Sequence, residues 1–499
     1  MGLIKQQSIK GTIYSYAGVL LGFATVAILF PKYFTPAEIG AINLLISYSM
    51  ILGQLGTLGF PSAIIRFFPK YRTGDGKHNG FVAIILIASL IGVVFFILGY
   101  LFLKPILLES NRESSPVFVK YFFLIIPLSL ANLLFYNLEA YANAIYKSAA
   151  GVFLKDFIQR ILILIPFTAV IFELIEFNQY IYYYAAAIII TTFILIIYLT
   201  SIRNFHITIK PNNENRTNLG DFTSVSLYGL LVGFSALSLQ RIDGILINEY
   251  FNEAFTGIYT TTFYFGTLVI IPSRVINRIS YTVVSDGITQ NDLKKVKDVY
   301  EKTSIIQLIA GTLLVAGLIS NLDNIFRILP AEYMAGKWVV IWIALSNLVR
   351  MSGGAVDGII AYSKYYRYNS LLIGVLLVCT IGFIVILIKD YGLSGVAFAT
   401  FLGVVIFNII RIIFVYRKFG MMPYKLSHAI ILLFGVAAGG LAYIIPENEN
   451  LMLDIAIRGS VLVLIFAFLI YISKVSKDTN KLILQGFAIL KGKAKNENK

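Results

Sequence analysis

The sequence is poor in the residues that build many enzyme active sites. Its 499 residues include one cysteine, Cys379, and three histidines. A single cysteine excludes an intramolecular disulfide, and its place inside an apolar segment argues against a thiol-based mechanism. The chain also holds no phosphate loop of the G-x-x-x-x-G-K-[ST] type and no H-E-x-x-H motif. We therefore expect no metal site, no cofactor and no ATP hydrolysis by this chain.

Acidic residues are also scarce. There are 26 Asp and Glu against 41 Lys and Arg, which gives a net charge of +15, and charged residues make up only 13% of the sequence. Hydrophobic residues make up 58% and the mean hydropathy is +0.80, whereas soluble domains are about 45–50% apolar. A basic excess can indicate nucleic-acid binding. Here the basic residues cluster between apolar segments, so we expect no nucleic-acid partner.

Long apolar segments are what the sequence has in abundance. A bilayer core of roughly 30 Å needs about 20 apolar residues in a helix, and about fourteen such segments follow one another, with little room left for a soluble domain. We therefore predict an all-α, polytopic membrane protein. The predicted spans are 11–31, 39–60, 79–103, 117–138, 150–172, 179–201, 222–248, 256–279, 303–321, 337–357, 369–388, 393–415, 427–445 and 453–473.

Lys and Arg cluster in alternate gaps between these spans. This asymmetry predicts that the N-terminus and the C-terminus are both cytoplasmic. The basic residues left on the predicted outer side are Lys32, Lys104, Arg112, Lys120, Arg327, Lys337, Lys389 and Arg458. The outer loops are short, the longest covering roughly residues 104–116, so we expect no catalytic platform on that side and no enzyme activity there.

Two parts of the chain share a pattern of glycines and aromatic residues. Gly18-x-x-x-Gly22-Phe23 parallels Gly229-x-x-x-Gly233-Phe234, and Tyr33-Phe34-x-x-Ala37-x-x-Gly40 parallels Tyr250-Phe251-x-x-Ala254-x-x-Gly257. Close glycine pairs are also ordinary helix-packing devices. Both copies begin at the predicted cytoplasmic side, as parallel six-helix repeats must. We therefore predict two pseudo-symmetric six-helix lobes with two further helices at the C-terminus.

The predicted parts follow from this repeat. They are an N-lobe over 1–206, a cytoplasmic linker over 207–221, a C-lobe over 222–418, helices 13 and 14 over 419–473 and a basic cytoplasmic tail over 474–499. Within the predicted cytoplasmic connection 280–302, residues 292–299 are expected to form a short amphipathic helix on the inner leaflet or a solvated connector.

Arginines inside or at the ends of the spans are the candidate binding residues. A charge in hydrocarbon costs roughly 2.5–3.5 kcal/mol on insertion scales, so such residues usually face a cavity or a partner. Arg241 lies in the outer half of its span. Arg274 and Arg278 follow Pro272 and share a helix face, and Arg66 follows a proline at the corresponding place in the first repeat. Guanidinium groups match phosphate oxygens; snorkelling is the alternative for Arg274 and Arg278.

Glu139 is a candidate ion-coupling carboxylate. It lies on a polar stripe along one face of its predicted helix. From this position it could bind a proton or Na⁺, or it could form a structural pair with Lys155 or Arg160.

Two further carboxylates are open to either a coupling or a structural role. Asp243 is two residues from Arg241, so the two side chains are expected on different helix faces and not to pair with each other. Asp243 then faces a cavity or ties its helix to a neighbour. Asp357 lies with Arg350 towards the cytoplasmic end of a span, where a structural ion pair is at least as well supported. Asn408 and Arg411, in the next-but-one span, are expected to snorkel to the boundary.

Two motifs and the helix count carry a resemblance to a known family. The segment Gly-Phe-Pro-x-x-x-x-Arg-Phe-Phe-Pro-Lys-Tyr at 59–71 and the segment Tyr-Gly-Leu-Ser-Gly-Val-Ala-Phe-Ala at 391–399, with fourteen helices in a six-plus-six repeat, resemble one branch of the multidrug/oligosaccharidyl-lipid/polysaccharide (MOP) superfamily. This is the polysaccharide-exporter branch of Wzx-type O-antigen and capsule flippases. The resemblance covers nearly the whole chain.

The resemblance implies two lobes around a cationic cavity that opens alternately to either side of the bacterial inner membrane. The implied substrate is an undecaprenyl-pyrophosphate-linked oligosaccharide, moved to the outer leaflet for lipopolysaccharide or capsule synthesis. Polysaccharide polymerase and assembly proteins are then the implied partners. On this basis Arg66, Arg241 and Arg274 best suit the cavity cations.

Two other functions remain open. A cation-coupled multidrug exporter of the same superfamily usually has twelve helices and an acidic cavity, whereas this sequence has two more helices and intramembrane arginines. A membrane enzyme or scaffold of glycan assembly is disfavoured by the missing catalytic loop.

Overall fold

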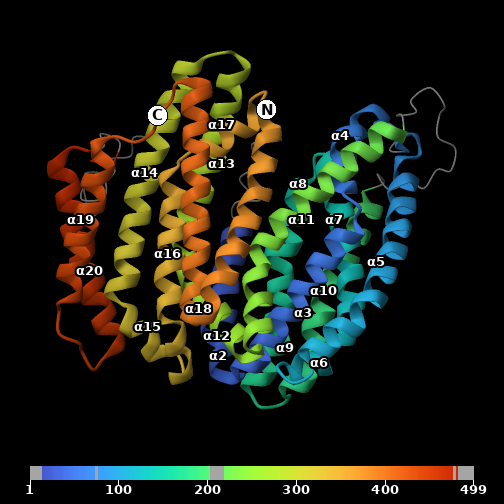
Figure 1. Ribbon diagram of the computed structural model, residues 1–499, viewed down its shortest axis with the longest axis horizontal. Helices are drawn as coiled ribbons and strands as arrows, with labels where there is room; N and C mark the ends of the chain where they lie inside the picture. The colour runs from blue at the N-terminus through green and yellow to red at the C-terminus, as the bar shows by residue number, and fades with distance from the viewer. Residues whose placement is uncertain (1–13, 74–76, 203–218, 476–478, 481–499) are drawn as a thin grey trace. The chain divides into compact units, whose positions relative to one another are not determined.

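The structure, a computed structural model, describes residues 14–73, 77–202, 219–475 and 479–480. In this part of the chain, long helices run side by side (Figure 1), and twelve of them are long and apolar enough to cross a membrane. The predicted class, an all-helical multi-pass membrane protein, is confirmed. Residues 207–218 of the predicted linker (207–221) lie outside the described residues. So do residues 476–478 and 481–499 of the predicted tail (474–499).

Three of the fourteen predicted spans do not correspond one to one with these twelve helices. The spans at 369–388 and 393–415 are joined in α18 (Tyr366–Phe419), which is broken at Gly392, where φ is 55° and ψ is −138°. The span at 150–172 is divided into α8 (Ser148–Val152), the π-helical turn η4 (Phe153–Ile158) and α9 (Gln159–Ile171), without interruption of the helical path. The fourteen-helix prediction is therefore consistent with the structure.

The helices divide into two compact units. The first unit comprises residues 1–261 and 373–396, and the second comprises 262–372 and 397–499. The first unit holds α8, η4, α9 and the middle part of α18, which are described above. It also holds η1 (Ala24–Leu29), α2 (Phe30–Tyr33), α3 (Pro36–Gly56), α4 (Phe60–Tyr71), η2 (His78–Gly80), α5 (Phe81–Asn111), α6 (Pro116–Lys120), η3 (Phe122–Leu124), α7 (Ile125–Ala144), α10 (Phe177–Ser201), α11 (Leu219–Tyr250) and the start of α12 (Glu253–Thr267).

The second unit holds the end of α12 and the later part of α18. Its other helices are η6 (Leu268–Ile270), α13 (Ile271–Thr289), α14 (Leu293–Ser320), α15 (Leu322–Ile328), η7 (Ala331–Gly336), α16 (Lys337–Ser352), α17 (Val356–Tyr362), α19 (Leu426–Tyr443) and α20 (Leu451–Ser473). The division into two lobes at 206 and 222 stays a prediction.

Two spans break at the prolines that the sequence singles out. α3 ends at Gly56, the chain passes through Gly59 with φ 74°, and α4 starts with Pro61 in its first turn. α12 likewise passes through η6 into α13, whose first turn holds Pro272. Proline is tolerated in a first turn because its missing N–H would have no intrahelical partner there.

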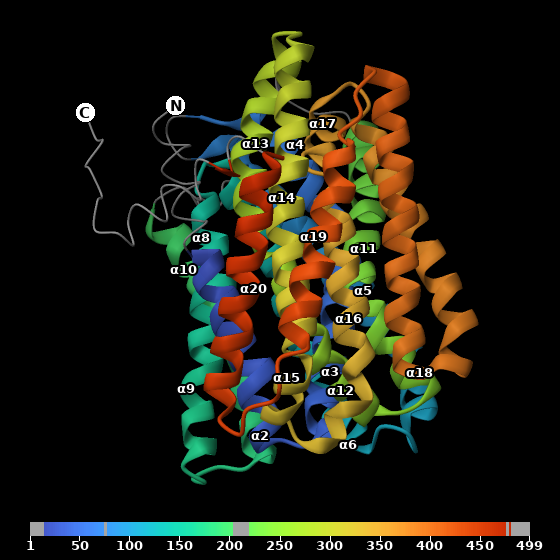
Figure 2. The same ribbon diagram turned by 90° about the vertical axis from the view of Figure 1, so that its left-hand side faces the viewer.

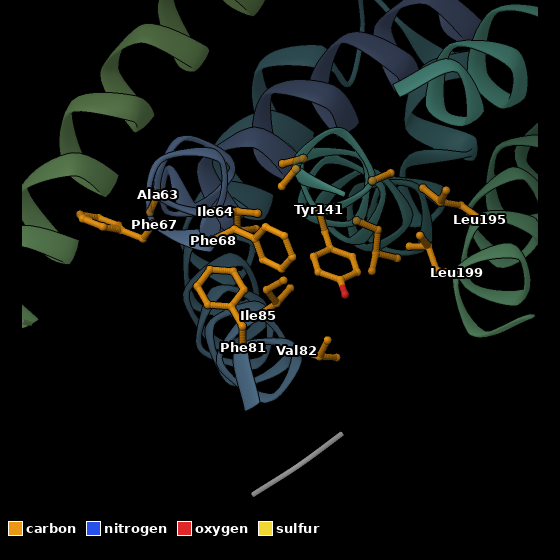
Figure 3. Packing of buried hydrophobic residues seen from close by; sticks show 14 of the residues in the cluster. Ala63, Ile64, Phe67, Phe68, Phe81, Val82, Ile85, Tyr141, Leu195 and Leu199 are labelled. Carbon is orange, nitrogen blue, oxygen red and sulfur yellow. The ribbon is translucent and has the colours of Figure 1, made fainter. Parts of the chain in front are cut away.

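Aromatic packing stabilises the first unit near the end of α4. Figure 3 shows Phe68 of α4 between Phe81 of α5 and Tyr141 of α7, with ring centroids 5.5 and 5.4 Å apart. All three side chains are buried. Helix association within a bilayer depends on close packing rather than on exclusion of water, so this interlocked cluster fixes α4 against α5 and α7.

The first span, Tyr14–Tyr33 (called helix 1), and the segment formed by α8, η4 and α9 (called helix 5) approach each other through glycines. A Cβ at Gly18 would overlap the main-chain oxygen of Asp156, and a Cβ at Gly22 would lie 3.2 Å from the guanidinium carbon of Arg160. Each helix contains a π-helical turn near this contact, η1 and η4.

In the second unit, α19 and α20 pack against α14, as Figures 1 and 2 both show. Gly435 of α19 lies against Thr312, and a Cβ at Gly439 would lie 3.2 Å from the Cβ of Ala316. These helices are the two that the sequence places outside the repeat.

A buried ion pair fixes the N-terminal end of α20. Asp454 and Arg458 are 1% and 5% exposed, with 2.8 Å between Asp454 Oδ2 and Arg458 Nε. Asn324 of α15 and the Asn448 N–H also donate to Asp454. The main-chain oxygens that accept from Arg458 are those of Ser320, Tyr443 and Ile445, at 3.3, 3.1 and 2.8 Å. Both charges therefore have hydrogen-bond partners inside the protein.

The expected amphipathic helix at 292–299 is wrong. α13 continues to Thr289, and α14 begins at Leu293 with Asp292 accepting a hydrogen bond from the Lys295 N–H at 3.0 Å. With 28 residues, α14 is about 42 Å long at 1.5 Å per residue. Its length therefore exceeds the roughly 30 Å bilayer core, and its polar first turns are the part expected to extend beyond it.

The orientation has a direct test. In a Cys379→Ser background, Glu447→Cys lies in the exposed α19–α20 connection, which is predicted to be outside. We expect a membrane-impermeant thiol reagent to label it in intact cells. Gln290→Cys, exposed in the α13–α14 turn, is the matched control and should react only after lysis. The reverse pattern would overturn the predicted orientation.

Candidate functional site

A half-buried guanidinium without a carboxylate partner lies on α11. Arg241 Nη2 contacts the Met50 Sδ of α3 at 3.3 Å, and its Nε is buried without a hydrogen-bond partner among the described residues. A thioether sulfur is only a weak acceptor. No carboxylate in the described part of the chain lies within 4.0 Å of this cation. An uncompensated cation inside a span is unfavourable by itself, so this geometry suits an anionic ligand.

Glycines on α11 bring polar side chains of α3 to the same helix contact. A Cβ at Gly233, a residue of the sequence repeat, would overlap the Gln54 amide, and a Cβ at Gly244 would lie 2.9 Å from Asn43 Oδ1. The side chains that these glycines admit to the α3–α11 contact are neutral amides, which do not compensate the charge of Arg241.

Asp243 is turned away from this contact. It is 7% exposed, and its Oδ2 accepts a hydrogen bond of 2.6 Å from the Tyr259 hydroxyl of α12. Two residues on a helix are separated by about 200°, which is why Arg241 faces α3 while Asp243 faces α12. The sequence prediction of separate helix faces agrees with this geometry, and the contact with Tyr259 is a tie between neighbouring helices.

The other three predicted arginines are divided between the units. Arg66 is exposed on α4, with its guanidinium carbon 5.9 Å from the Phe67 ring centroid. Arg274 is exposed and Arg278 is half-buried on α13. Arg66 and Arg241 lie in the first unit, whereas Arg274 and Arg278 lie in the second. Their role in binding stays a prediction.

Glu139 is half-buried on α7, against the start of helix 5. A Cβ at Gly151 would lie 2.7 Å from its Oε1. The Lys155 ammonium lies 4.4 Å from the Tyr136 ring centroid and forms no ion pair with Glu139 within 4.0 Å. The alternative of a Glu139–Lys155 pair is therefore not seen, and Glu139 stays a candidate coupling carboxylate.

Arg160 is an intramembrane cation that the sequence reasoning considered only as a partner for Glu139. It lies about 18 Å along helix 5 from Ser148 at 1.5 Å per residue, and its guanidinium group packs against Gly22 of helix 1. The small residue on the neighbouring helix was the signal that could have indicated its position.

The expectation that Arg411 snorkels is wrong. It is 1% exposed and forms an ion pair with Asp357 of α17. Its Nη2 donates to Asn408 Oδ1 at 3.2 Å, and its guanidinium carbon lies 4.1 Å from the Phe407 ring centroid. Arg350 forms no ion pair within 4.0 Å among the described residues, and Asp357 pairs instead with Arg411, 54 positions later. This favours the structural role that the sequence left open for Asp357.

A hydrogen-bond network extends from this pair towards α19. The Tyr424 hydroxyl lies 3.1 Å from Asn408 Nδ2 and 2.8 Å from Ser352 Oγ, and Ser304 Oγ lies 2.9 Å from His428 Nε2. Burial raises the pKa of the Tyr424 phenol, which keeps it neutral and able to donate. The network joins α14, α16, α18 and α19, so its evident role is to hold helices together.

A metal centre of the common protein type is not seen within the described residues. They contain no group of three or more His, Cys, Asp and Glu side chains that could hold a metal ion.

Comparison with solved structures shows which fold this is. A lipid II flippase, MurJ, in an inward closed conformation superposes with a TM-score of 0.74 over 94% of this chain and 100% of that chain, at 17% identity. An inward-facing multidrug-resistance MATE transporter of the MOP superfamily gives 0.60 over 82% and 94%, at 15% identity. The MATE multidrug transporter DinF-BH, solved as a complex, gives 0.51 over 85% and 97%, at 16% identity.

No family model and no curated protein sequence matches the chain. The chain therefore has the fold of these solved transporters, and the Wzx-type branch of the MOP superfamily stays a prediction.

Proposed function

We propose that this protein flips a lipid-linked oligosaccharide across the bacterial inner membrane by alternating access, without enzymatic chemistry. The substrate of this proposal is an undecaprenyl-pyrophosphate repeat unit for a surface polysaccharide such as O-antigen or capsule. The observation that carries the proposal is the unpaired guanidinium of Arg241 inside a span. A solved structure of the same fold is named a lipid II flippase, which supports a lipid substrate.

Fixed cations address the main barrier to flipping. Moving a pyrophosphate through hydrocarbon without compensation costs several kcal/mol or more for each charge. A guanidinium fork can replace water around two phosphate oxygens at once. In the proposal Arg241 provides this group, and Arg66, Arg274 and Arg278 are further candidate contacts.

The carboxylates differ in how they suit ion coupling. Asp243 bonds to Tyr259 and Asp357 pairs with Arg411, so both have structural partners. Glu139 has no ion pair among the described residues. We therefore propose Glu139 as the first position to test for coupling to H⁺ or Na⁺.

The competing proposal is a cation-coupled multidrug exporter. It draws on the MATE transporters that share the fold and are named as multidrug transporters. The unpaired cation on α11 argues against it, because a cationic drug would be repelled from Arg241.

Deleting the gene tests the proposed function. We expect the cell to lose one surface polysaccharide and to accumulate the lipid-linked repeat unit on the cytoplasmic leaflet, since polymerase and assembly proteins would receive no substrate. Extraction of lipid-linked intermediates and surface-glycan analysis measure both effects. An intact glycan coat with raised sensitivity to cationic toxins would instead support the drug exporter, and normal display without a redundant flippase would contradict the flippase.

A further inference from the structure

We propose that a buried polar cluster at the predicted outer ends of α5, α6, α11 and α12 is the outer gate of this transporter. The cluster, called the outer latch, consists of Asn111, Ser115, Asn248 and Glu253. All four residues lie in the first unit. The proposal rests on the alternating access of the proposed function, because a gate is needed only where access alternates.

Glu253 is the charged centre of the latch. The side chain is 2% exposed, and its two oxygens accept hydrogen bonds from the main-chain N–H groups of Val117 at 3.0 Å and Phe118 at 2.8 Å. No basic side chain in the described part of the chain forms an ion pair with it. Hydrogen bonds to an ionised group are roughly twice as strong as neutral ones. Two amides of α6 therefore hold the start of α12.

Asn248 makes the second connection, from the end of α11. Its Oδ1 accepts from Ser115 Oγ at 2.8 Å, and its Nδ2 donates to Asn111 Oδ1 at 2.5 Å. These three side chains are at most 1% exposed. Both connections cross between residues predicted to belong to the N-lobe and residues predicted to belong to the C-lobe.

The latch lies on the predicted outer side of Arg241, the candidate binding residue. Arg241, Gly244 and Asn248 recur at helical spacing on one face of α11, and all three contact elements of the N-terminal half. Seven residues separate Arg241 from Asn248, about 10 Å along the helix. A ligand that leaves Arg241 along this face towards the predicted outer side therefore meets the latch.

The latch also lies beside the contact that relates the two sequence repeats. A Cβ at Gly40 would overlap the main-chain oxygen of Glu253, and a Cβ at Gly257 would overlap that of Pro36. Gly40 and Gly257 occupy equivalent repeat positions, and so do Pro36 and Glu253. The contact is thus reciprocal, as expected on a pseudo-twofold axis. Separation of α3 from α12 at this point would move both repeats symmetrically.

The chemistry of the latch allows it to open. Its connections are hydrogen bonds at a predicted water boundary, so each donor and acceptor can exchange its partner for water. Opening would therefore leave no buried group without a partner, a condition that otherwise makes separation costly.

Thiol labelling tests the latch without knowledge of the substrate. In a Cys379→Ser background, Met50→Cys places a reporter at the Arg241 contact. We expect Glu253→Ala to raise its labelling rate by an impermeant reagent in intact cells about tenfold, because two charge-assisted hydrogen bonds are lost. Glu253→Gln should have a smaller effect. Glu113→Ala, an exposed acid in the α5–α6 connection, is the control and should leave the rate unchanged.

A second variant protects the test against misfolding. Asn248→Ala removes the hydrogen bonds from α11 to Ser115 and Asn111 and leaves those of Glu253 in place. We expect this variant to reach normal abundance in the membrane and also to raise the labelling rate of the Met50→Cys reporter. If Glu253→Ala and Asn248→Ala both label at the control rate, the latch is overturned.

Cross-linking gives the opposite perturbation. Asn111→Cys with Asn248→Cys, joined by a short, cleavable bifunctional thiol reagent in the absence of the reporter, should stop export until the link is cleaved. Normal export by the linked protein would overturn the gate. If the labelling rates respond as expected but Arg241→Ala still exports, the latch stands and the proposed anion site fails.

Discussion

Arg241→Ala is expected to abolish export of the lipid-linked oligosaccharide while the protein remains in the membrane at its normal abundance. The guanidinium has no carboxylate partner among the described residues, its Nη2 contacts a thioether and its Nε has no hydrogen-bond partner there, so its removal deletes a ligand contact rather than an internal ion pair. Arg241→Lys should restore export only in part, because an ammonium group keeps the charge but loses the bidentate fork. Surface polysaccharide per unit of membrane protein is the measurement.

Thermal stability separates this role from a structural one. An uncompensated charge inside a span is unfavourable by roughly 2.5–3.5 kcal/mol. The alanine variant should therefore unfold at the same temperature as the parent or at a higher one in detergent. Gln240→Ala, at the exposed neighbouring position on α11, is the matched control and should export normally. Full export by Arg241→Ala, or a large loss of its stability, would assign the residue to packing.

Arg458→Ala is expected to give the largest loss of stability in the chain. Removing one partner of a buried, hydrogen-bonded ion pair typically costs about 3–5 kcal/mol, because the other charge is left without compensation. Asp454 would be that charge, at 1% exposure. The measurement is thermal unfolding of the purified protein in detergent, with proteolysis of the α19–α20 connection as a local readout.

An exposed arginine in the same region provides the comparison. Arg327 donates to the main-chain oxygens of Asn448 and Glu449 at 2.9 and 2.7 Å. Arg327→Ala should cost about 1 kcal/mol or less, since water can replace those bonds. The double variant of Asp454→Ala with Arg458→Ala should be more stable than Arg458→Ala alone. Equal losses for Arg327→Ala and Arg458→Ala would contradict the buried-pair account.

Hydropathy predicted the membrane spans because bilayer thickness sets a length that a sequence either reaches or does not. It could not place helix ends that leave the bilayer. Residues 292–299 are polar and therefore appeared as a connection, yet they continue α14 because Asp292 caps that helix outside the apolar region. Polarity marks the membrane boundary, whereas capping marks the helix boundary.

The sequence identified charged residues in the spans but could not choose their partners. Arg411 is compensated by Asp357, 54 residues earlier, and only the packing of α17 against α18 reveals this. Arg241 and Asp243 are two residues apart, so helical geometry alone predicted that they do not pair.

The outer latch was missed for a different reason. Asn111, Ser115 and Asn248 are common loop and helix-end residues, and nothing in their spacing marks them as a cluster.

The π-helical turns in helices 1 and 5 have a consequence for comparing this chain with others. Such a turn fits an additional residue into a helix by closing its hydrogen bonds over five positions instead of four. Each residue of an ordinary helix turns the chain by about 100°. A relative that is one residue shorter within 24–29 would therefore direct Gly18 and Gly22 away from helix 5, although both sequences would appear equally apolar. Alignments that forbid gaps within membrane spans would match the wrong residues in this pair of helices, and distant relatives would score as less similar than their structures are.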